Sequence, residues 1–239
     1  MNIAVILAAG SGRRMQTETP KQFLAVGDRC ILAHTVAAFE TAADIAAIVI
    51  VTSTPYIYMV EEMGRKMGWK KVRHVIAGGK QRADSTQAAL RILQAEGVAG
   101  DSHILFHDAA RMLVTQRIIA DVCRKLADGA RAVNVLLPVT DTIVELDGNH
   151  RTHSLCRSRL RAVQTPQGFR LDTLAQAYRL RAAAGFTETT DDCGVVERFL
   201  PETEIAVVDG DPVNLKVTTP MDLTVAAALL SATARVEAT

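Results

Sequence analysis

The stretch IAVILAAGSGRRM, residues 3–15, opens the chain with an apolar run that ends in two glycines and two arginines. An unbroken apolar run that stops at a turn signal is typical of a strand buried on both faces of a parallel sheet. Gly10 and Gly12 let the backbone approach a ligand closely, and Arg13 and Arg14 follow in the same loop. The stretch therefore predicts a buried strand whose far end meets an anion.

Further apolar runs repeat this pattern, and helical patterns separate them. The runs lie at residues 45–53, 72–77, 103–109 and 132–139. Apolar residues at helical spacing occupy residues 31–40, 58–68, 84–96 and 115–127. This alternation predicts right-handed crossovers and an α/β fold with a doubly wound, mostly parallel sheet.

The alternation stops after Pro138. Residues 140–160 hold a polar Asp-Gly-Asn turn between short alternating segments, which predicts a protruding β-arm that leaves the sheet. Beyond the arm we expect a helix over 171–185, a strand over 203–210, a β-like segment at 214–218 and a helix from Pro220. The sequence has no internal repeat or low-complexity linker, so we interpret residues 1–239 as a single domain with the arm at 140–160 inserted in it.

The composition argues against several classes of function. The chain has 239 residues and a net charge of +1, which gives no global field for nucleic acid or an acidic membrane. No apolar stretch reaches the length of a membrane span. Cys30, Cys123, Cys156 and Cys193 form no CxxC pair, which argues against a zinc or redox site. We see no signal-peptide pattern at the start, so the chain is expected to be cytoplasmic.

Charged and polar residues follow several of the predicted strands at their carboxyl ends. They are Lys21 after the first strand, Lys80, Arg82, Asp84 and Ser85 after the third, Asp108 and Arg111 after the fourth, and Lys216 near the end of the β-like segment. In an open parallel sheet, loops and helix N-termini converge at the carboxyl edge. We therefore expect one cleft lined by several cations and at least one carboxylate.

Each motif also has a simpler structural interpretation. A glycine turn with arginines can be a solvated loop, Asp84 can cap the next helix, and His107 can be a half-buried histidine at a strand end. Met15 stands where a dinucleotide-binding GxGxxG motif needs glycine or alanine, and Walker A spacing is absent. His150 and His153 have no carboxylate or cysteine at metal-ligand spacing. The joint occurrence of charged motifs at successive strand ends favours a functional site.

Fixed cations and backbone amides without a nucleophile triad suit a polyphosphate substrate, because phosphoryl transfer needs mainly positioning and charge stabilisation. Attack on a nucleotide α-phosphate builds negative charge on its equatorial oxygens and on the departing pyrophosphate. Asp108 is the candidate ligand for Mg²⁺ or for a substrate hydroxyl, since Mg²⁺ is usually held by few carboxylates together with phosphates. Arg111, Arg157 and Lys216 would meet a second anionic substrate.

A series of motifs in fixed order resembles one enzyme family. The motifs are LAAGSGRRMQTETPKQF (7–23), GGKQRADS (78–85), HDAAR (107–111), PVTDT (138–142), CRSRLRAVQTPQGF (156–169), TD (190–191) and NLKVTTPMDL (214–223). From residue 3 to residue 230 the chain resembles the 2-C-methyl-D-erythritol 4-phosphate cytidylyltransferase family of the non-mevalonate isoprenoid pathway. The first motif is shared with other nucleotidyltransferases, whereas the ordered combination is specific to this family.

The resemblance implies a Rossmann-like nucleotidyltransferase fold, and the reaction of CTP with 2-C-methyl-D-erythritol 4-phosphate to give 4-diphosphocytidyl-2-C-methyl-D-erythritol and pyrophosphate. Mg²⁺ is the implied cofactor. The implied catalytic residues are Arg14, Lys21, Arg157 and Lys216. The implied CTP-binding residues are Ala8, Ala9, Gly10, Gly12, Gly79, Arg82, Asp84 and Ser85. The implied acceptor-binding residues are Asp108, Arg111, Thr142 and Thr165, and Asp108 is also the implied metal ligand.

The resemblance also implies a homodimer joined through the arm at 140–160, with Thr142 and Arg157 completing the partner's site. The acceptor phosphate would be the nucleophile without a protein base, because a phosphate monoester is already ionised near neutral pH. The expected partners are these small-molecule substrates, and neither nucleic acid nor a membrane is expected.

The sequence departs from the family pattern at several positions. Met112 stands where the family usually has proline, which removes a fixed φ and predicts a more mobile loop. Cys156 replaces an aspartate before Arg157, which leaves the orientation of Arg157 open. Residues 192–194 read Asp-Cys-Gly instead of an acidic-Ala-Ser run, and Leu7 stands where proline is often found.

Two other functions stay open from the sequence. A related nucleotidyltransferase that acts on ribitol phosphate or a sugar phosphate would share the first motif, and substrate selection separates it from the cytidylyltransferase. A nucleotide-binding or regulatory module without turnover is the third possibility. The complete set of Arg14, Lys21, Asp108 and Lys216 argues against it, whereas binding without pyrophosphate release would support it.

Overall fold

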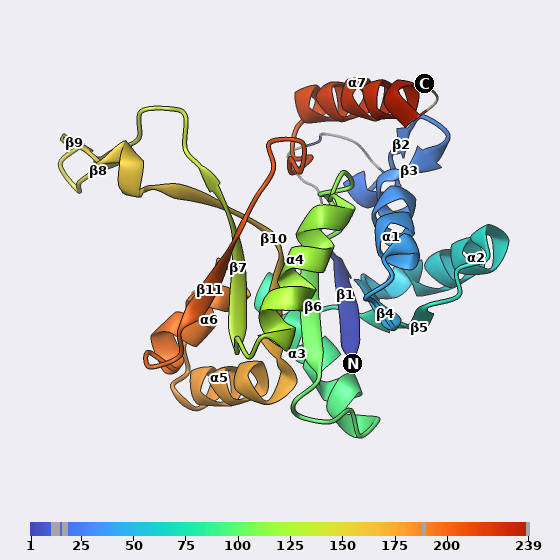
Figure 1. The fold of residues 1–239 in the computed structure, drawn as a ribbon, viewed down its shortest axis with the longest axis horizontal. Helices are drawn as coiled ribbons and strands as arrows, with labels where there is room; N and C mark the ends of the chain where they lie inside the picture. The colour runs from blue at the N-terminus through green and yellow to red at the C-terminus, as the bar shows by residue number, and fades with distance from the viewer. Residues whose placement is uncertain (11–14, 16–18, 188–189, 238–239) are drawn as a thin grey trace.

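The structure of the protein is a computed structural model that describes residues 1–10, 15, 19–187 and 190–237. Within these residues a seven-stranded sheet runs in the order β11-β7-β10-β6-β1-β4-β5, with helices on both faces (Figure 1). Strands β1, β4, β5 and β6 are parallel to one another, and β11 is parallel to β7. The predicted α/β fold with a doubly wound, mostly parallel sheet is confirmed.

The strands and helices largely follow the predicted order. The strands of the central sheet are β1 (Asn2–Ala8), β4 (Ala47–Thr52), β5 (Val72–Ala77), β6 (His103–Asp108), β7 (Ala132–Pro138), β10 (Arg161–Arg170) and β11 (Ile205–Asp209). Two short pairs lie outside it, β2 (Ala25–Val26) with β3 (Arg29–Cys30) and β8 (Val144–Leu146) with β9 (Thr152–Ser154).

The helices lie on the two faces of the sheet and along one end. They are α1 (Ile31–Thr41), α2 (Ile57–Met67), α3 (Arg82–Ala95), α4 (Gln116–Ala127), α5 (Leu171–Ala183), α6 (Asp192–Phe199) and α7 (Pro220–Glu237), with 3-10 turns η2 (Lys21–Phe23), η3 (Thr54–Tyr56) and η4 (Arg157–Arg159). None of the helices in the described parts of the chain combines the length and the apolar character that crossing a membrane requires.

The apolar run of β1 is buried on both sides because helices cover both faces of the sheet. Ala4 and Ile6 belong to the core cluster that Phe39 of α1 completes. Ile3 and Val5 point to the opposite face, into the cluster formed with α3, α5 and α6. Neither side of the strand faces water, which explains why its sequence shows no polar alternation.

Strand β10 is the element that the sequence analysis does not predict, although it lies inside the sheet. It runs antiparallel to both β6 and β7. It buries Gln164, Thr165 and Gln167 and contains a cis Thr165–Pro166 peptide bond. Buried polar side chains and an internal proline hide the apolar pattern that marks a central strand. Helix α6 is also missed, because its eight residues are too few to show helical periodicity.

The β-like segment predicted at 214–218 is wrong, because these residues form a loop. The Val217 N–H donates to the Ala110 carbonyl at 2.9 Å, which ties this loop to the one after β6. Leu215 and Val217 pack in an apolar cluster under α7, and this packing explains their alternation with polar residues. Lys216 therefore reaches the site from a loop and not from the end of a strand.

The arm at 140–160 is confirmed as a hairpin that extends away from the body of the molecule (Figure 1). At its tip, the Asp147 carboxylate accepts the backbone N–H groups of Asn149 and Arg151, which fixes the predicted turn. The apolar side chains of Val144 and Leu146 are 45% and 62% exposed. The arm has almost no core of its own, and it offers these side chains to solvent.

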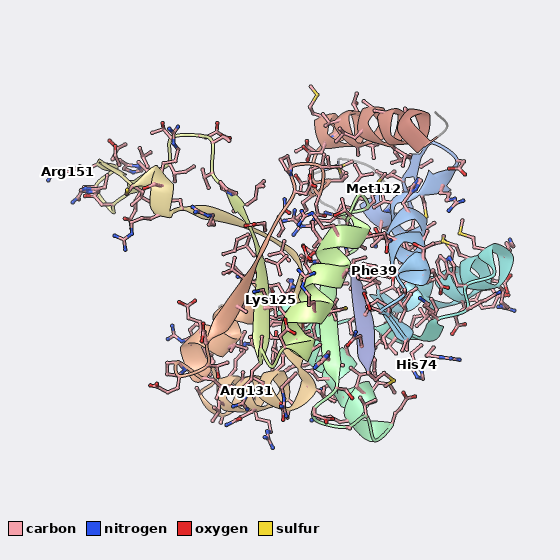
Figure 2. All side chains as sticks on the ribbon, viewed as in Figure 1. Phe39, His74, Met112, Lys125, Arg131 and Arg151 are labelled. Atoms are coloured by element: carbon pink, nitrogen blue, oxygen red, sulfur yellow. The ribbon has the colours of Figure 1, made fainter. Side chains whose placement is uncertain are left out.

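Met112 lies in a third apolar cluster, between the loop after β6 and α7 (Figure 2). It is buried and packs with Val26, Ile31 and Val217. The effect of the missing proline on the mobility of this loop stays a prediction, and the structure adds an apolar contact that the sequence analysis does not include. A proline here would fix the backbone angle φ. The buried methionine side chain instead anchors the loop by removing apolar surface from water.

Candidate active site

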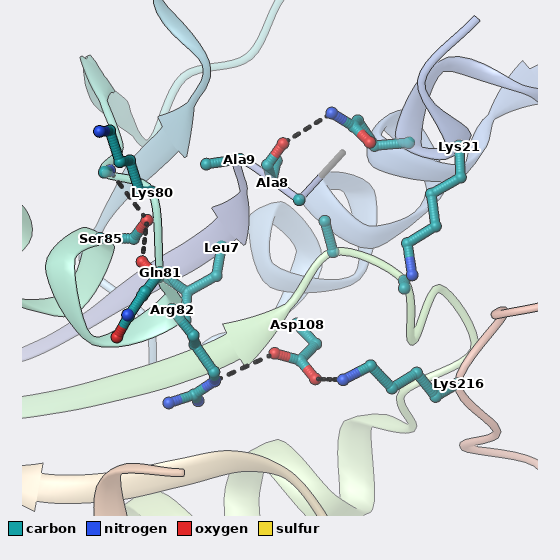
Figure 3. A pocket seen from close by; sticks show the side chains of 15 residues that line it. Leu7, Ala8, Ala9, Lys21, Lys80, Gln81, Arg82, Ser85, Asp108 and Lys216 are labelled. Atoms are coloured by element: carbon teal, nitrogen blue, oxygen red, sulfur yellow. Dashed lines mark hydrogen bonds and ion pairs between the residues drawn. The ribbon is translucent and has the colours of Figure 1, made fainter. Parts of the chain in front are cut away.

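A cleft of about 610 Å³ lies at the carboxyl ends of β1 and β6, as predicted from the order of the motifs. The start of α3 forms one wall, and the loop that carries Lys216 forms another (Figure 3). The predicted site residues that line it are Ala8, Ala9, Gly10, Lys21, Gly79, Arg82, Ser85, Asp108 and Lys216. Residues from four separate motifs thus meet in one place.

Asp108, at the end of β6, is the centre of the charge arrangement in the cleft. Lys216 Nζ lies 2.7 Å from Asp108 Oδ2, and Arg82 Nε lies 3.5 Å from Asp108 Oδ1 (Figure 3). Burial by itself would raise the pKa of the Asp108 carboxyl, but Arg82 and Lys216 outweigh it and hold that pKa well below its usual range. Asp108 is therefore an anion near neutral pH, which can accept hydrogen bonds but has no proton to donate.

A chain of hydrogen bonds holds the backbone of Asp108 from behind. The Asp108 N–H donates to Thr165 Oγ1 at 3.0 Å, and that hydroxyl lies 3.0 Å from His107 Nδ1. His107 Nε2 lies 3.0 Å from the Arg111 carbonyl, which can only accept, so Nε2 carries the proton and Nδ1 accepts from Thr165. Thr165 is buried and its hydroxyl is occupied on both sides. This geometry gives Thr165 a positioning role under Asp108.

His107 predicts a dependence of stability on pH. It is fully buried, and burial lowers its pKa to about 4. An unfolded histidine titrates near 6.5, so protonation favours the unfolded state, and stability present above pH 6.5 is lost as the pH falls toward 4. As the pH falls from 6.5 to 5, we expect the protonation of His107 in the unfolded state to lower the free energy of unfolding by about 2 kcal/mol. Urea unfolding at the two pH values should show a smaller loss in His107→Asn than in the wild type.

The matched control is His150→Asn, the same substitution at an exposed residue of the arm. It should leave the pH dependence as in the wild type. An equal pH dependence in His107→Asn and the wild type would contradict the role assigned to this histidine.

The loop before α3 confirms the simpler interpretation of Asp84. The Asp84 carboxylate accepts the Gln81 N–H at 2.9 Å in a capping box, and Asp84 does not line the cleft. Ser85 lines the cleft, and its hydroxyl accepts the Gly79 N–H at 3.3 Å. A Cβ on Gly79 would lie 2.1 Å from the Cβ of Asp84. Only glycine fits at position 79, because the side chain of Asp84 occupies the space that a Cβ would need.

We expect Gly79→Ala to displace either the loop or the capping carboxylate. Overpacking of this kind costs about 1–3 kcal/mol of stability. The affinity for CTP, the nucleotide that the resemblance implies, should fall at least about tenfold, or 1.4 kcal/mol. Urea unfolding and calorimetric titration with CTP measure the two effects. Gly148→Ala is the control, since a Cβ there would meet nothing within 4 Å. Unchanged CTP affinity in Gly79→Ala would remove this loop from the nucleotide site.

Lys21 and Gln22 tie the first loop to the rest of the cleft. The Gln22 amide donates to the Ala8 carbonyl at 2.8 Å, at the end of β1 (Figure 3). Lys21 Nζ donates to the Val217 carbonyl at 3.0 Å, in the loop that carries Lys216. Lys21 therefore reaches across the cleft from the side of the first strand. The other predicted members of this loop, Gly12 and Arg14, lie outside the described residues.

Arg111 does not line the cleft. Its guanidinium donates to the carbonyls of Asn214 at 2.8 Å and Val163 at 3.0 Å, and burial lowers its pKa from the usual value. It joins the loop at 214–218 to the start of β10. Arg111 thus stabilises the loop that carries Lys216. The sequence analysis predicts a contact with the acceptor substrate instead.

Thr142 and Arg157 lie on the arm and do not line the cleft. Arg157 is exposed, and it donates to the Thr140 carbonyl at 3.0 Å across the base of the arm. Cys156 contacts Ser158 at 3.2 Å, between sulfur and hydroxyl oxygen. The arm residues are therefore presented outward, away from Asp108.

Several residues of the site escape the sequence analysis. Gln22 and Gln81 line the cleft although neither carries charge, and the motifs that contain them could have indicated both. Asp192 makes a 2.6 Å ion pair with Arg82 from 110 positions away. No spacing rule predicts that pair. Asp192 was noted in the sequence only as part of an altered run.

One carboxylate of the cleft can hold a metal ion. Among the described residues, no group of three or more histidines, cysteines and acidic side chains gathers in one place. Mg²⁺ needs no such group, because it is commonly bound through one or two carboxylates together with substrate phosphates. Asp108, anionic and at the edge of a cleft lined by Lys21, Arg82 and Lys216, fits that donor set.

Comparison with known proteins gives a consistent picture. The family model described as 2-C-methyl-D-erythritol 4-phosphate cytidylyltransferase matches residues 2–232. A protein of that name from Thermobifida fusca is 40% identical over 233 residues, covering 95% of this chain and 92% of the relative. A bifunctional ribulose 5-phosphate reductase/CDP-ribitol pyrophosphorylase from Haemophilus influenzae is 38% identical, over 94% of this chain and 47% of the relative. The chain thus spans about half the length of that relative.

Solved structures of the same kind share the fold. The 4-diphosphocytidyl-2C-methyl-D-erythritol synthase from Anaerococcus prevotii superposes with a TM-score of 0.81 at 26% identity, with 96% of each chain covered. The 2-C-methyl-D-erythritol 4-phosphate cytidylyltransferase from Thermus thermophilus has a TM-score of 0.72 at 29% identity, covering 96% of this chain and 98% of its own. In both comparisons the alignment covers nearly the whole chain, so the similarity is to the fold as a whole.

Proposed function

This chain belongs to the 2-C-methyl-D-erythritol 4-phosphate cytidylyltransferase family, and from that premise we propose how its cleft performs the family's reaction. The enzyme joins CTP to 2-C-methyl-D-erythritol 4-phosphate, giving 4-diphosphocytidyl-2-C-methyl-D-erythritol and pyrophosphate for isoprenoid synthesis. The observation that carries the assignment of roles is Asp108, held between Arg82 and Lys216 beside two glycine loops.

CTP takes the side of the cleft formed by β1 and the start of α3. The backbone of Ala8, Ala9 and Gly10 is close to the triphosphate, and Gly79, Arg82 and Ser85 hold the nucleoside end. The start of α3 also borders this side of the cleft, and the N–H groups and dipole of a helix N-terminus favour the negative charge of the triphosphate. Lys21 is assigned to the α-phosphate, where negative charge grows in the transition state. The resemblance to the family gives Arg14 the same role.

The acceptor takes the side of Asp108 and Lys216. Asp108 accepts hydrogen bonds from acceptor hydroxyls, and Lys216 meets the acceptor phosphate. A phosphate oxygen of the acceptor attacks the α-phosphorus of CTP, the bond from that phosphorus to the bridging oxygen breaks, and pyrophosphate leaves with the electron pair. The nucleophile is already ionised near neutral pH, so the reaction needs no protein base.

Mg²⁺ is the proposed cofactor, with Asp108 as its protein ligand. When bound, the ion neutralises charge on the triphosphate, as is usual for nucleotide substrates. Lys216 and Arg82 already contact the two oxygens of Asp108. Lys216 contacts Oδ2 closely at 2.7 Å, whereas Arg82 is 3.5 Å from Oδ1, so Oδ1 would be the oxygen more open to substrates and to the ion.

The arm is proposed to join two subunits into a homodimer. The exposed Val144 and Leu146 give it an apolar surface, and such surfaces commonly mark contacts between proteins. Thr142 and Arg157, which lie away from their own cleft, would then reach the acceptor end of the partner's cleft. The cytoplasmic location stays a prediction.

We expect Arg157→Ala to raise the KM for the acceptor about tenfold or more, because the loss of one charged contact is worth roughly 1.5–3 kcal/mol. CTP binding should stay nearly unchanged, since Arg157 touches only one substrate in this account. Steady-state rates with each substrate varied in turn give both values. A collapse of CTP binding would contradict the division of the cleft into two halves.

Hybrid dimers test whether the arm serves the partner. Lys21→Ala and Arg157→Ala subunits, each impaired alone, are mixed and allowed to exchange. If the arm acts across subunits, one site of each hybrid combines an unaltered cleft with an unaltered arm, so activity reappears. No recovery after verified exchange would place Arg157 in its own subunit's site.

A second acceptor, ribitol phosphate, is favoured by one observation. The relative named CDP-ribitol pyrophosphorylase is 38% identical to this chain over 229 residues, about as similar as the cytidylyltransferases. A competition experiment with CTP and equal amounts of the two acceptors decides between them through the ratio of the products. We expect the methylerythritol product to dominate. A dominant CDP-ribitol product would assign the chain to the second acceptor.

A further inference from the structure

A fully buried carboxylate lies directly behind the cleft, at the start of α6. Asp192 Oδ2 accepts Arg82 Nη1 at 2.6 Å. Asp192 Oδ1 accepts the hydroxyls of Thr86 at 2.9 Å and Tyr178 at 2.6 Å. The Asp192 N–H donates to Gln167 of β10 at 3.1 Å. Contacts from α3, α5 and β10 thus fix a carboxylate that does not line the cleft.

Arg82 is shared unequally between two carboxylates. Its Nη1 lies 2.6 Å from Asp192, whereas its Nε lies 3.5 Å from Asp108. Arginine and carboxylate commonly form two parallel bonds of about 2.7–2.9 Å. The contact to Asp108 is therefore long and single. The attachment to Asp192 holds the guanidinium back from Asp108.

Removal of the Asp192 charge has a definite electrostatic consequence. Burial disfavours the charge on Arg82, but Asp192 and Asp108 outweigh that and raise its pKa. A buried guanidinium that loses one of two anions is driven toward the other. Arg82 would then close on Asp108 with two hydrogen bonds. Since Lys216 already holds Asp108 Oδ2, little of that carboxylate would remain for a substrate.

We propose that Asp192 is a positioning residue for the reaction, which anchors Arg82 at a distance from Asp108 and so keeps Asp108 open to the acceptor. The inference rests on the proposed role of Asp108 in acceptor binding. It also gives a role to the first residue of the altered run at 192–194. Asp192 supplies the anchor, the buried Cys193 packs in the core, and Gly194 donates its N–H to the Asp191 cap at 2.9 Å.

Asp192→Asn tests the proposal. Asparagine keeps the size of the side chain and an oxygen for Thr86 and Tyr178, but removes the anion that attracts Arg82. We expect kcat/KM for the acceptor to fall at least about tenfold, mainly through KM, because small displacements of site residues cost up to about a hundredfold. The dissociation constant for CTP should rise less, by about threefold (0.65 kcal/mol) at most, because Gly79 and Ser85 still hold the nucleoside end when Arg82 moves. Initial rates and calorimetric titration measure the two quantities.

Asp191→Asn is the matched control. It makes the same change one residue earlier, at the cap of α6, and Asp191 bonds Gln167 and Gly194 without touching Arg82. It should lower thermal stability through the lost cap and leave kcat/KM for the acceptor near the wild-type value. An equal loss in both variants would overturn the proposal, because loosening of α6 would then explain both.

The Arg82→Met background supplies a second test. A residue that acts only through Arg82 has nothing left to position there, so Asp192→Asn should cause no further loss of kcat/KM. Losses that multiply in the double variant would overturn the proposal, since Asp192 would then act independently of Arg82.

A measurement without substrate separates this inference from the proposed function. In ¹⁵N-labelled protein the Nε–H resonance of Arg82, identified by its loss in Arg82→Met, should move in Asp192→Asn as the pair with Asp108 closes. An unmoved resonance overturns the inference whatever substrates the enzyme uses. A wild type that fails to release pyrophosphate contradicts the proposed function, and the resonance still reports how Arg82 is shared.

Discussion

Replacing Lys21 with alanine is expected to lower kcat at least about a hundredfold, with a modest loss of CTP affinity. A cation aimed at charge that develops in the transition state contributes on the order of 3 kcal/mol. Lys21 lines the cleft on the side of the first loop, and it reaches the Val217 carbonyl at 3.0 Å across from that loop. Single-turnover rates with saturating CTP and acceptor measure the chemical step directly.

Two further variants make this result specific. Lys21→Met keeps the aliphatic stem and should lose as much rate as Lys21→Ala, which separates lost charge from lost packing. Lys66→Ala removes an exposed lysine of α2 outside the cleft and should leave the rate unchanged. Equal rates for Lys21→Ala and the wild type would contradict the role of Lys21.

Replacing Asp108 with asparagine should lower kcat/KM for the acceptor about a hundredfold, since charged hydrogen bonds to a substrate contribute roughly 1.5–3 kcal/mol each. The variant keeps the shape of the side chain but leaves Arg82 and Lys216 without their shared anion. Acceptor kinetics at saturating CTP give the value. Because Thr165 holds the backbone of residue 108, the fold should persist, and a thermal unfolding curve checks this.

The control for this variant is Asp101→Asn, at an exposed position before the opposite end of β6. It makes the same chemical change away from the cleft, so its kinetics should match the wild type. If Asp108→Asn kept the wild-type kcat/KM for the acceptor, the acceptor half of the cleft would have to be placed elsewhere.

The sequence predicts the sheet and the location of the cleft because both follow from local patterns. The apolar run at residues 3–9 has no polar face, which is correct for a strand with helices on both sides. The strand ends carry Lys21, Arg82 and Asp108, and parallel topology brings these ends together. Functional residues that lie together in one loop can therefore be predicted from the sequence alone.

The parts that escape prediction depend on contacts between distant segments. Strand β10 buries Gln164 and Gln167, whose partners are Asp211, Asn134 and Asp191. Their polar side chains look like a loop until those partners are known. Asp84 and Arg111 carry the charge expected of site residues, but their side chains bind backbone groups of the protein itself. Sequence alone cannot distinguish a charge offered to a ligand from one used in this way.

The most direct test of the account is pyrophosphate release by the wild-type enzyme with Mg²⁺ and 2-C-methyl-D-erythritol 4-phosphate, with CTP, UTP, ATP and GTP supplied in turn. Reactions without acceptor give the background. We predict release with CTP that depends on the acceptor, and little release with the other nucleotides. Release that favours another nucleotide, or no release while CTP binds, would contradict the assignment of this cleft as the site of cytidylyl transfer.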